Sequence, residues 1–256
     1  MQIQIIIFTL FFLVFGFAIF KLLKRKRIKT LPIPETYRAI LAWEVPFYQQ
    51  LSPEKKTAFE LRVQQFLAGI KITGVNTVVE DIDRVLIAAS AVIPIFNFNN
   101  WEYPNLNEVL LYPDSFNHDF DQQGDGRNIL GMVGGGALNY VMILSQYELR
   151  QAFTNKTGKS NTAIHEFVHL IDKTDGQIDG LPEAILDKKY IVPWLQLMQK
   201  EMQEIWKEDS DINPYGTTNP SEFFAVVAEY FFERPDLLQE KHPELFEMME
   251  VIFGGR

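Results

Sequence analysis

The stretch "TAIHEFVHLID", residues 162–172, places two histidines and a glutamate in the middle of an otherwise apolar run. Apolar residues on nearly every side of such a run predict a helix that is buried all round. Buried His and Glu side chains are costly unless a partner satisfies them. We therefore expect His165, Glu166 and His169 to meet a common partner, which the rest of the fold must help to hold.

The polar residues of this helix have the form HExxH. Two histidines four residues apart lie on one face of a helix, so both imidazoles can reach a single Zn²⁺ at about 2.0–2.1 Å. Glu166 projects beside that position, where it can take a proton from the activated water and pass it to a leaving amine. The chain has no cysteine, so a metal site must use His and carboxylate ligands. The competing interpretation is a pair of core histidines hydrogen-bonded to backbone.

A catalytic zinc normally takes three protein ligands, so a third must be found. Asp172 lies one further turn along the same helix face. The apolar segment "NPSEFFAVVAEYFFERP" (219–235) carries Glu222 and Glu229 seven residues apart, on one face of a second helix. Glu222 also has a structural interpretation, because Asn219 is a natural N-cap and the third helical position favours a carboxylate. Position in the sequence leaves the choice among the three carboxylates open.

Tyr215 lies in a loop seven residues before Glu222. A phenol near a zinc can donate a hydrogen bond to the oxyanion of a tetrahedral intermediate. The alternative is a tyrosine that only decorates a Pro-Gly turn. The other two histidines, His118 and His242, are isolated in the sequence, and we expect them to be surface or structural residues.

The N-terminus is apolar from residue 3 to residue 20 and is followed by a basic cluster at 21–29. About 18 apolar residues approach the length that spans a bilayer core, and basic residues stay on the cytoplasmic side. We expect residues 1–22 to be a transmembrane anchor in contact with the lipid bilayer through residues 3–20. Residues 23–38 then form a basic juxtamembrane linker, and the following domain faces the cytoplasm from the inner membrane. The competing interpretation is a core or interfacial helix.

The remaining sequence indicates one α+β domain over residues 39–256, because strands come first and helices later. A net charge of −9 argues against nucleic acid as a partner. The expected elements are a helix that begins at Ser52, a strand at 74–80, a helix that ends near Pro94, a strand at 108–113, a strand at 137–145, a helix at 187–208 and a helix at 220–232, followed by a short helix near the C-terminus.

Several motifs together resemble one known family. "HEFVHLID" (165–172), "DG" at 175–176 and at 179–180, and "NPYGTTNPSEFFAVVAEYFFERP" (213–235) are similar to the Mlc titration factor A family of zinc metallopeptidases, also described as anti-repressors. The resemblance covers about residues 40–250. It implies a zincin-like (gluzincin) domain that is mainly helical with a small sheet.

The resemblance also implies roles for individual residues. His165, His169 and Glu222 would be the zinc ligands, Glu166 the general base, and Tyr215 the donor to the transition state. It therefore favours Glu222 where spacing left three carboxylates open.

Two further expectations depend on the same resemblance. Glu229 would orient one of the ligands, and the strand at 137–145 would be the edge strand above the zinc, able to pair with an extended peptide. The first hypothesis is thus a membrane-tethered zinc peptidase that acts on a peptide or protein substrate. The second is an anti-repressor that binds a transcription repressor and uses zinc for structure. A third is a structural membrane protein without activity.

Overall fold

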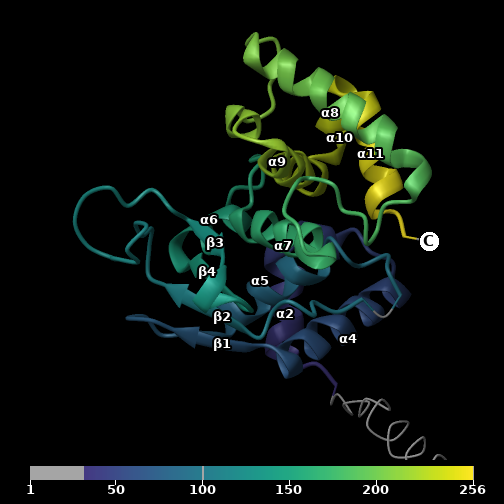
Figure 1. The fold of residues 1–256 in the computed structure, drawn as a ribbon. Helices are drawn as coiled ribbons and strands as arrows, with labels where there is room; N and C mark the ends of the chain where they lie inside the picture. Colours follow the sequence, from purple (N-terminus) through teal and green to yellow (C-terminus); the bar gives the residue numbers. More distant parts are fainter. Residues whose placement is uncertain (1–31, 100, 256) are drawn as a thin grey trace, which may run out of the picture. The chain divides into compact units, whose positions relative to one another are not determined.

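The HExxH segment forms a helix, α7 (Thr162–Asp172), in a computed structural model that describes residues 32–99 and 101–255 (Figure 1). Residues 32–256 form one compact unit. The strands are β1 (Lys71–Gly74), β2 (Glu108–Tyr112), β3 (Gly131–Val133) and β4 (Val141–Ser145). The other α-helices are α2 (Glu35–Glu44), α3 (Pro46–Gln49), α4 (Pro53–Gly69), α5 (Asp81–Val92), α6 (Gln146–Thr154), α8 (Ile191–Trp206), α9 (Pro220–Glu233), α10 (Pro235–Lys241) and α11 (Pro243–Phe253). Short 3-10 helices are η1 (Gly136–Leu138), η2 (Lys173–Asp175), η3 (Lys188–Tyr190) and η4 (Pro214–Thr217).

The four strands make a mixed sheet in the order β1-β2-β4-β3. β1, β2 and β4 are parallel, whereas β3 lies antiparallel at the edge, with Gly131 opposite Leu144. Val109 and Met142 are fully buried in the main core, while Ile143 faces a smaller cluster on the other side of the sheet. Both faces of the sheet are therefore covered, which is why β2 and β4 have nearly continuous apolar sequences.

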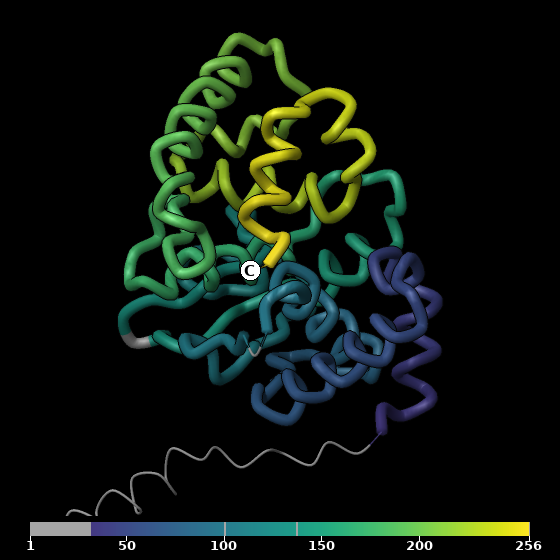
Figure 2. The backbone as a smooth tube through the Cα atoms, turned by 90° about the vertical axis from the view of Figure 1, so that its right-hand side faces the viewer, coloured from purple at the N-terminus to yellow at the C-terminus, as the bar shows by residue number. Residues whose placement is uncertain are grey.

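α7 lies between the sheet and the C-terminal helices, and both views show α8 to α11 gathered on the side of α7 away from the sheet (Figures 1 and 2). It contacts β3 and β4 on one side and α9 on the other, and α5 also packs against it. All residues from Ala163 to Asp172 are buried. The apolar surroundings expected of this helix are therefore confirmed, and they come from sequence segments far apart in the chain.

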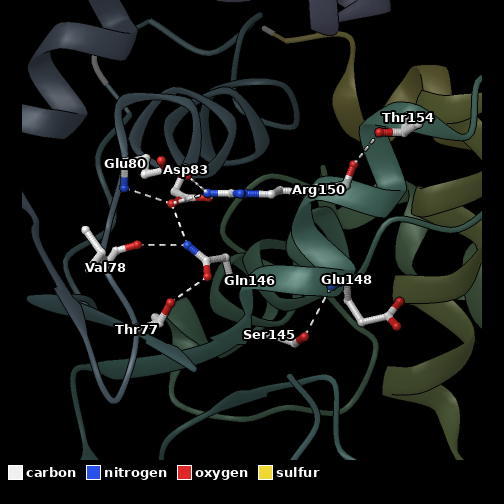
Figure 3. Close-up of polar contacts among 9 residues, drawn as sticks. All are labelled: Thr77, Val78, Glu80, Asp83, Ser145, Gln146, Glu148, Arg150 and Thr154. Carbon is white, nitrogen blue, oxygen red and sulfur yellow. Dashed lines mark hydrogen bonds and ion pairs between the residues drawn. The ribbon is translucent and has the colours of Figure 1, made fainter. Parts of the chain in front are cut away.

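A buried carboxylate ties the start of α5 to α6, as Figure 3 shows. Asp83 is fully buried and accepts hydrogen bonds from Arg150 Nε at 2.7 Å and from Gln146 Nε2 at 2.7 Å. It also accepts from the backbone N–H of Glu80 at 2.9 Å, which completes a capping box at the start of α5. Since α5 packs against α7, this network stabilises the position of a helix that supports the HExxH helix.

Most of the expected elements are present, with local corrections. The helix predicted from Ser52 is α4, and the Ser52 side chain caps it by accepting from Lys55 N. The strand predicted at 74–80 is wrong: β1 ends at Gly74, and Asn76 has a positive φ of 62°, which interrupts an extended chain. The strand predicted at 137–145 begins only at Val141.

The expected transmembrane helix is also corrected. Within the described residues, none of the helices combines the length and the apolar character that crossing a bilayer requires. The longest of them, α4, has 17 residues and includes Glu54, Lys55 and Arg62, whereas a span needs about 20 mostly apolar residues. The fold is α+β with a small mixed sheet, and the single-pass localisation at the cytoplasmic membrane is not supported. The stretch 3–20 that prompted both expectations lies outside the described residues.

Candidate metal centre

The HExxH helix starts at a cap that also joins it to α9. The Asn161 side chain accepts from the N–H of Ile164 at 3.2 Å, which satisfies one of the free donors of the first turn. The backbone N–H of Asn161 donates to Glu229 Oε2 at 2.6 Å, and its side-chain amide donates to Glu233 Oε1 at 2.8 Å. The beginning of α7 is therefore held against two carboxylates of α9.

Three ligand atoms from α7 and α9 converge on one point. His165 Nε2 lies 3.0 Å from His169 Nε2 and 2.9 Å from Glu222 Oε2, and the distance from His169 Nε2 to Glu222 Oε2 is 3.5 Å. Tetrahedral ligands at about 2.0–2.1 Å from a zinc lie about 3.3 Å from one another. His165, His169 and Glu222 therefore form a group that could hold a metal ion.

The second ring nitrogen of His165, Nδ1, has a hydrogen-bond partner that suits a metal ligand. Its Nδ1 lies 2.6 Å from Glu229 Oε1. An Nδ1–H that donates to a carboxylate leaves the Nε2 lone pair directed at the metal position. Burial alone would lower the pKa of His165, but the Glu222 and Glu229 carboxylates raise it to about 10. Burial likewise opposes ionisation of Glu222, yet the two imidazoles hold its pKa at about 2. The site thus favours cations.

Glu166 lies beside this group and is almost completely shielded from solvent. It is 5% exposed and makes no hydrogen bond to another described residue. Burial raises the pKa of its carboxyl, although the His165 and His169 rings oppose that shift. A Cβ on Gly131 would lie 2.8 Å from Glu166 Cγ and 2.9 Å from Oε1, so the edge strand β3 approaches Glu166 as closely as only a glycine allows.

Tyr215 approaches the group from η4. Its ring centroid lies 6.2 Å from that of His165, and the residue is 53% exposed. Partial burial and the carboxylates of Glu222 and Glu166 raise the pKa of the phenol, which keeps it a hydrogen-bond donor near neutral pH. Tyr215 therefore combines access to solvent with a place next to the metal position.

The other candidates lie outside the group of ligands. Asp172 Oδ2 accepts from the backbone N–H of Gly180 at 2.8 Å, and burial raises the pKa of Asp172 to about 6 despite that bond. Glu229 contacts His165 from behind and does not face the metal position. His118 is exposed, whereas His242 pairs with Asp211 at 2.8 Å. The strand predicted at 137–145 corresponds to β4, which was expected at the edge of the sheet. β4 instead lies between β2 and β3, and β3 is the edge strand.

Sequence reasoning missed the residues that hold the site in place. Asn161 precedes an apolar run and is a recognisable N-cap, so its cap could have been predicted. Nothing in the sequence pairs Gly131 with Glu166, because the two meet only through the sheet.

Two imidazoles one helical turn apart, a carboxylate from a second helix and a further glutamate beside them form a group that could hold a metal ion, and their HExxH pattern is one found in metallopeptidases. The chain belongs to the glucose-regulated metallo-peptidase M90 family, whose model matches residues 20–254.

Relatives of similar length support this assignment. An uncharacterized protein of Synechocystis sp. is 31% identical over 241 residues, which cover 90% of this chain and 87% of the relative. Proteins named Mlc titration factor A, from Pectobacterium atrosepticum and Escherichia fergusonii, are 25% and 24% identical, over 83% of this chain in both cases and over 83% and 85% of the relatives.

Proposed function

We propose that the protein is a zinc-dependent peptidase that hydrolyses peptide bonds in a peptide or protein substrate. The observation that carries the proposal is the convergence of His165 Nε2, His169 Nε2 and Glu222 Oε2 on one point beside the buried Glu166. Three ligands leave one position open, which is the arrangement of catalytic rather than structural zinc. When bound, the metal would supply a Lewis acid that activates water and polarises a carbonyl.

The residues around the metal position have separate tasks in this proposal. Glu166 accepts a proton from the attacking water and delivers it to the leaving amine. Tyr215 donates its phenolic O–H to the negative charge that develops on the carbonyl oxygen. Glu229 holds the His165 ring through Nδ1, which keeps Nε2 directed at the ion.

The test compares zinc content and peptide hydrolysis in the purified protein and in Glu166→Gln. A library of quenched-fluorescent peptides supplies the substrates. We expect the variant to bind one zinc per chain and to lose at least about 10²-fold in kcat, the size typical of a general base. Glu60→Gln is the matched control, because it removes a carboxylate of α4 that pairs with Arg38 and does not belong to the group of metal-ligand candidates. A Glu166→Gln variant that cleaves at the wild-type rate would exclude Glu166 as the base.

A second candidate function rests on the name of the relatives, Mlc titration factor A, which links those proteins to the repressor Mlc. Here the protein would bind a transcription repressor, and zinc would serve structure. This alternative predicts that Glu166→Gln leaves binding of the repressor unchanged, as measured by calorimetry. Peptide hydrolysis that depends on Glu166 separates the two candidates.

A further inference from the structure

Asp211, outside the metal centre, carries a carboxylate that is bonded to four side chains. Its Oδ2 accepts from Lys241 Nζ at 2.9 Å, from Lys159 Nζ at 3.0 Å and from the Tyr230 hydroxyl at 3.0 Å. Its Oδ1 lies 2.8 Å from His242 Nε2, and Lys159 Nζ also donates to the Asp211 backbone carbonyl. Partial burial opposes ionisation, but these partners hold the pKa of Asp211 well below its usual range.

The partners of Asp211 come from separate parts of the fold. Lys159 belongs to the segment that leads into the HExxH helix, and Tyr230 lies on α9. Lys241 and His242 stand where α10 gives way to α11. An isolated exposed ion pair stabilises little, whereas one carboxylate shared among several donors fixes its own backbone in three dimensions. The cluster therefore pins the loop at Asp211.

The short segment between Asp211 and Tyr215 is itself held in place, so the position of Asp211 constrains that of Tyr215. Ile212 is only 1% exposed and is buried in the main core. The Asn213 side chain accepts from the N–H of Tyr215 at 3.0 Å, and its backbone carbonyl accepts from the N–H of Gly216 at 3.0 Å. Only residues 212–214 separate Asp211 from Tyr215, and these contacts leave that short segment little freedom.

The Tyr215 side chain has no anchor of its own. It makes no hydrogen bond to another described residue, and it is half exposed beside the metal position. Its placement near His165 therefore depends on its loop. A donor to a developing charge must be held within about half an ångström of its working position. η4 packs against α9 and α8, and the bonds of Asp211 fix the chain that leads into it.

We propose that Asp211 is a positioning residue that holds Tyr215 at the metal centre by fastening the loop between α8 and η4 to the surrounding elements. The inference rests on the proposed role of Tyr215 as a transition-state donor. Lys159, Tyr230, Lys241 and His242 are the partners that make the fastening rigid.

The first arm of the test measures the loop without any substrate. Hydrogen exchange of the full-length protein reports the amides of Gly216 and Thr218, which are bonded within the loop. We expect Asp211→Asn to speed their exchange by about tenfold, since a bond to a charged group is lost, while exchange in α7 stays unchanged. Asp209→Asn is the matched control, because its side chain makes no hydrogen bond or ion pair with another described residue. Lys241→Gln serves as a second test should Asp211→Asn not fold. Wild-type exchange at both amides in these variants would overturn the proposal.

The second arm is a double-mutant cycle on the peptide cleaved fastest by the wild type. Asp211→Asn should lower kcat about tenfold with KM and zinc content nearly unchanged, and it should add no further loss in a Tyr215→Phe background. Equal losses in both backgrounds would overturn the proposal, because Asp211 would then act independently of Tyr215. Failure of the proposed function has a different signature: no peptide is cleaved, or Tyr215→Phe retains the wild-type kcat.

Discussion

Glu229→Gln is the substitution that tests most directly how the metal centre is oriented. The Glu229 carboxylate accepts from two donors at once, from His165 Nδ1 and from the backbone N–H of Asn161, both at 2.6 Å. Glutamine has nearly the same size but a single acceptor oxygen. Whichever way its amide lies, one of the two donors faces an NH₂ group. The substitution therefore breaks either the hydrogen bond from His165 Nδ1 or the hydrogen bond from the Asn161 N–H, which helps to hold residue 229 in place.

The expected size follows from the role of the carboxylate. Removing a hydrogen-bonded partner of a metal-ligating histidine lowers metal affinity about 10- to 100-fold, which equals about 1.4–2.8 kcal/mol. The loss also includes the negative charge that strengthens His165 as a ligand. We expect the dissociation constant of zinc to rise by this factor, while the folded structure persists because Glu229 is only one of many contacts between α7 and α9.

Competition with a chelator of known affinity measures the change in the zinc dissociation constant. Glu233→Gln is the matched control: Glu233 lies one turn further along α9 and accepts from the Asn161 side chain at 2.8 Å, but it does not contact His165. A zinc affinity that stays within twofold of the wild type in Glu229→Gln, or falls equally in Glu233→Gln, would refute the reasoning.

Three further predictions concern stability and the geometry of the site. Asp83→Asn should lower the free energy of unfolding by about 2 kcal/mol, because it removes the buried carboxylate that Arg150 bonds; urea unfolding measures it. Burial and the neighbouring Glu229 carboxylate raise the pKa of Glu233 to about 7, above its value of 4.5 in the unfolded chain. The protein should therefore be most stable below pH 4.5 with respect to this group and should lose at most about 3 kcal/mol as pH rises to 7 and above. Unfolding across that pH range measures the loss. Gly131→Ala should lower kcat about tenfold or more with zinc content unchanged, because the new Cβ displaces Glu166, the proposed general base, from its position; steady-state peptide hydrolysis measures it.

Matched variants separate these effects from general damage. Asp81→Asn alters an exposed carboxylate in the first turn of the same helix as Asp83 and should leave stability nearly unchanged. In Glu233→Gln the pH-dependent loss should disappear, and its persistence would contradict the assignment to Glu233. Gly135→Ala adds a Cβ that meets nothing within 4 Å, so a loss of kcat there equal to that of Gly131→Ala would contradict the steric argument.

The sequence was most informative where the chemistry depends on residues close together in the chain. His165 and His169 had to share a face because the helical repeat requires it, and the structure brings their Nε2 atoms to 3.0 Å. Capping residues such as Ser52 also act over three residues, so the start of α4 could be predicted. In both cases local geometry alone determines the outcome.

The sequence was least informative where two distant segments meet. Spacing could not choose Glu222 over Asp172 or Glu229, because the choice depends on how α9 packs against α7. The edge strand β3 was missed because it has only three residues, which are all partly exposed and lie in a glycine-rich stretch. The strand predicted at 74–80 failed for a different reason. Its residues fit a strand, but the Thr77 hydroxyl bonds Gln146 at 2.6 Å and the chain turns at Asn76.

The burial of α7 on every side has one more consequence, for how an ion would enter and leave. The two imidazoles sit on a helix that has no face free to move outward, and the helix start is clamped to α9 by Asn161. The helices that carry the donors cannot spread apart without opening the core, so an ion would have to leave past the half-exposed Tyr215 or during a rare opening of the protein. Zinc exchange should accordingly be slow even where equilibrium affinity is moderate, and the metal would behave as a long-term resident rather than as a freely exchanging ligand.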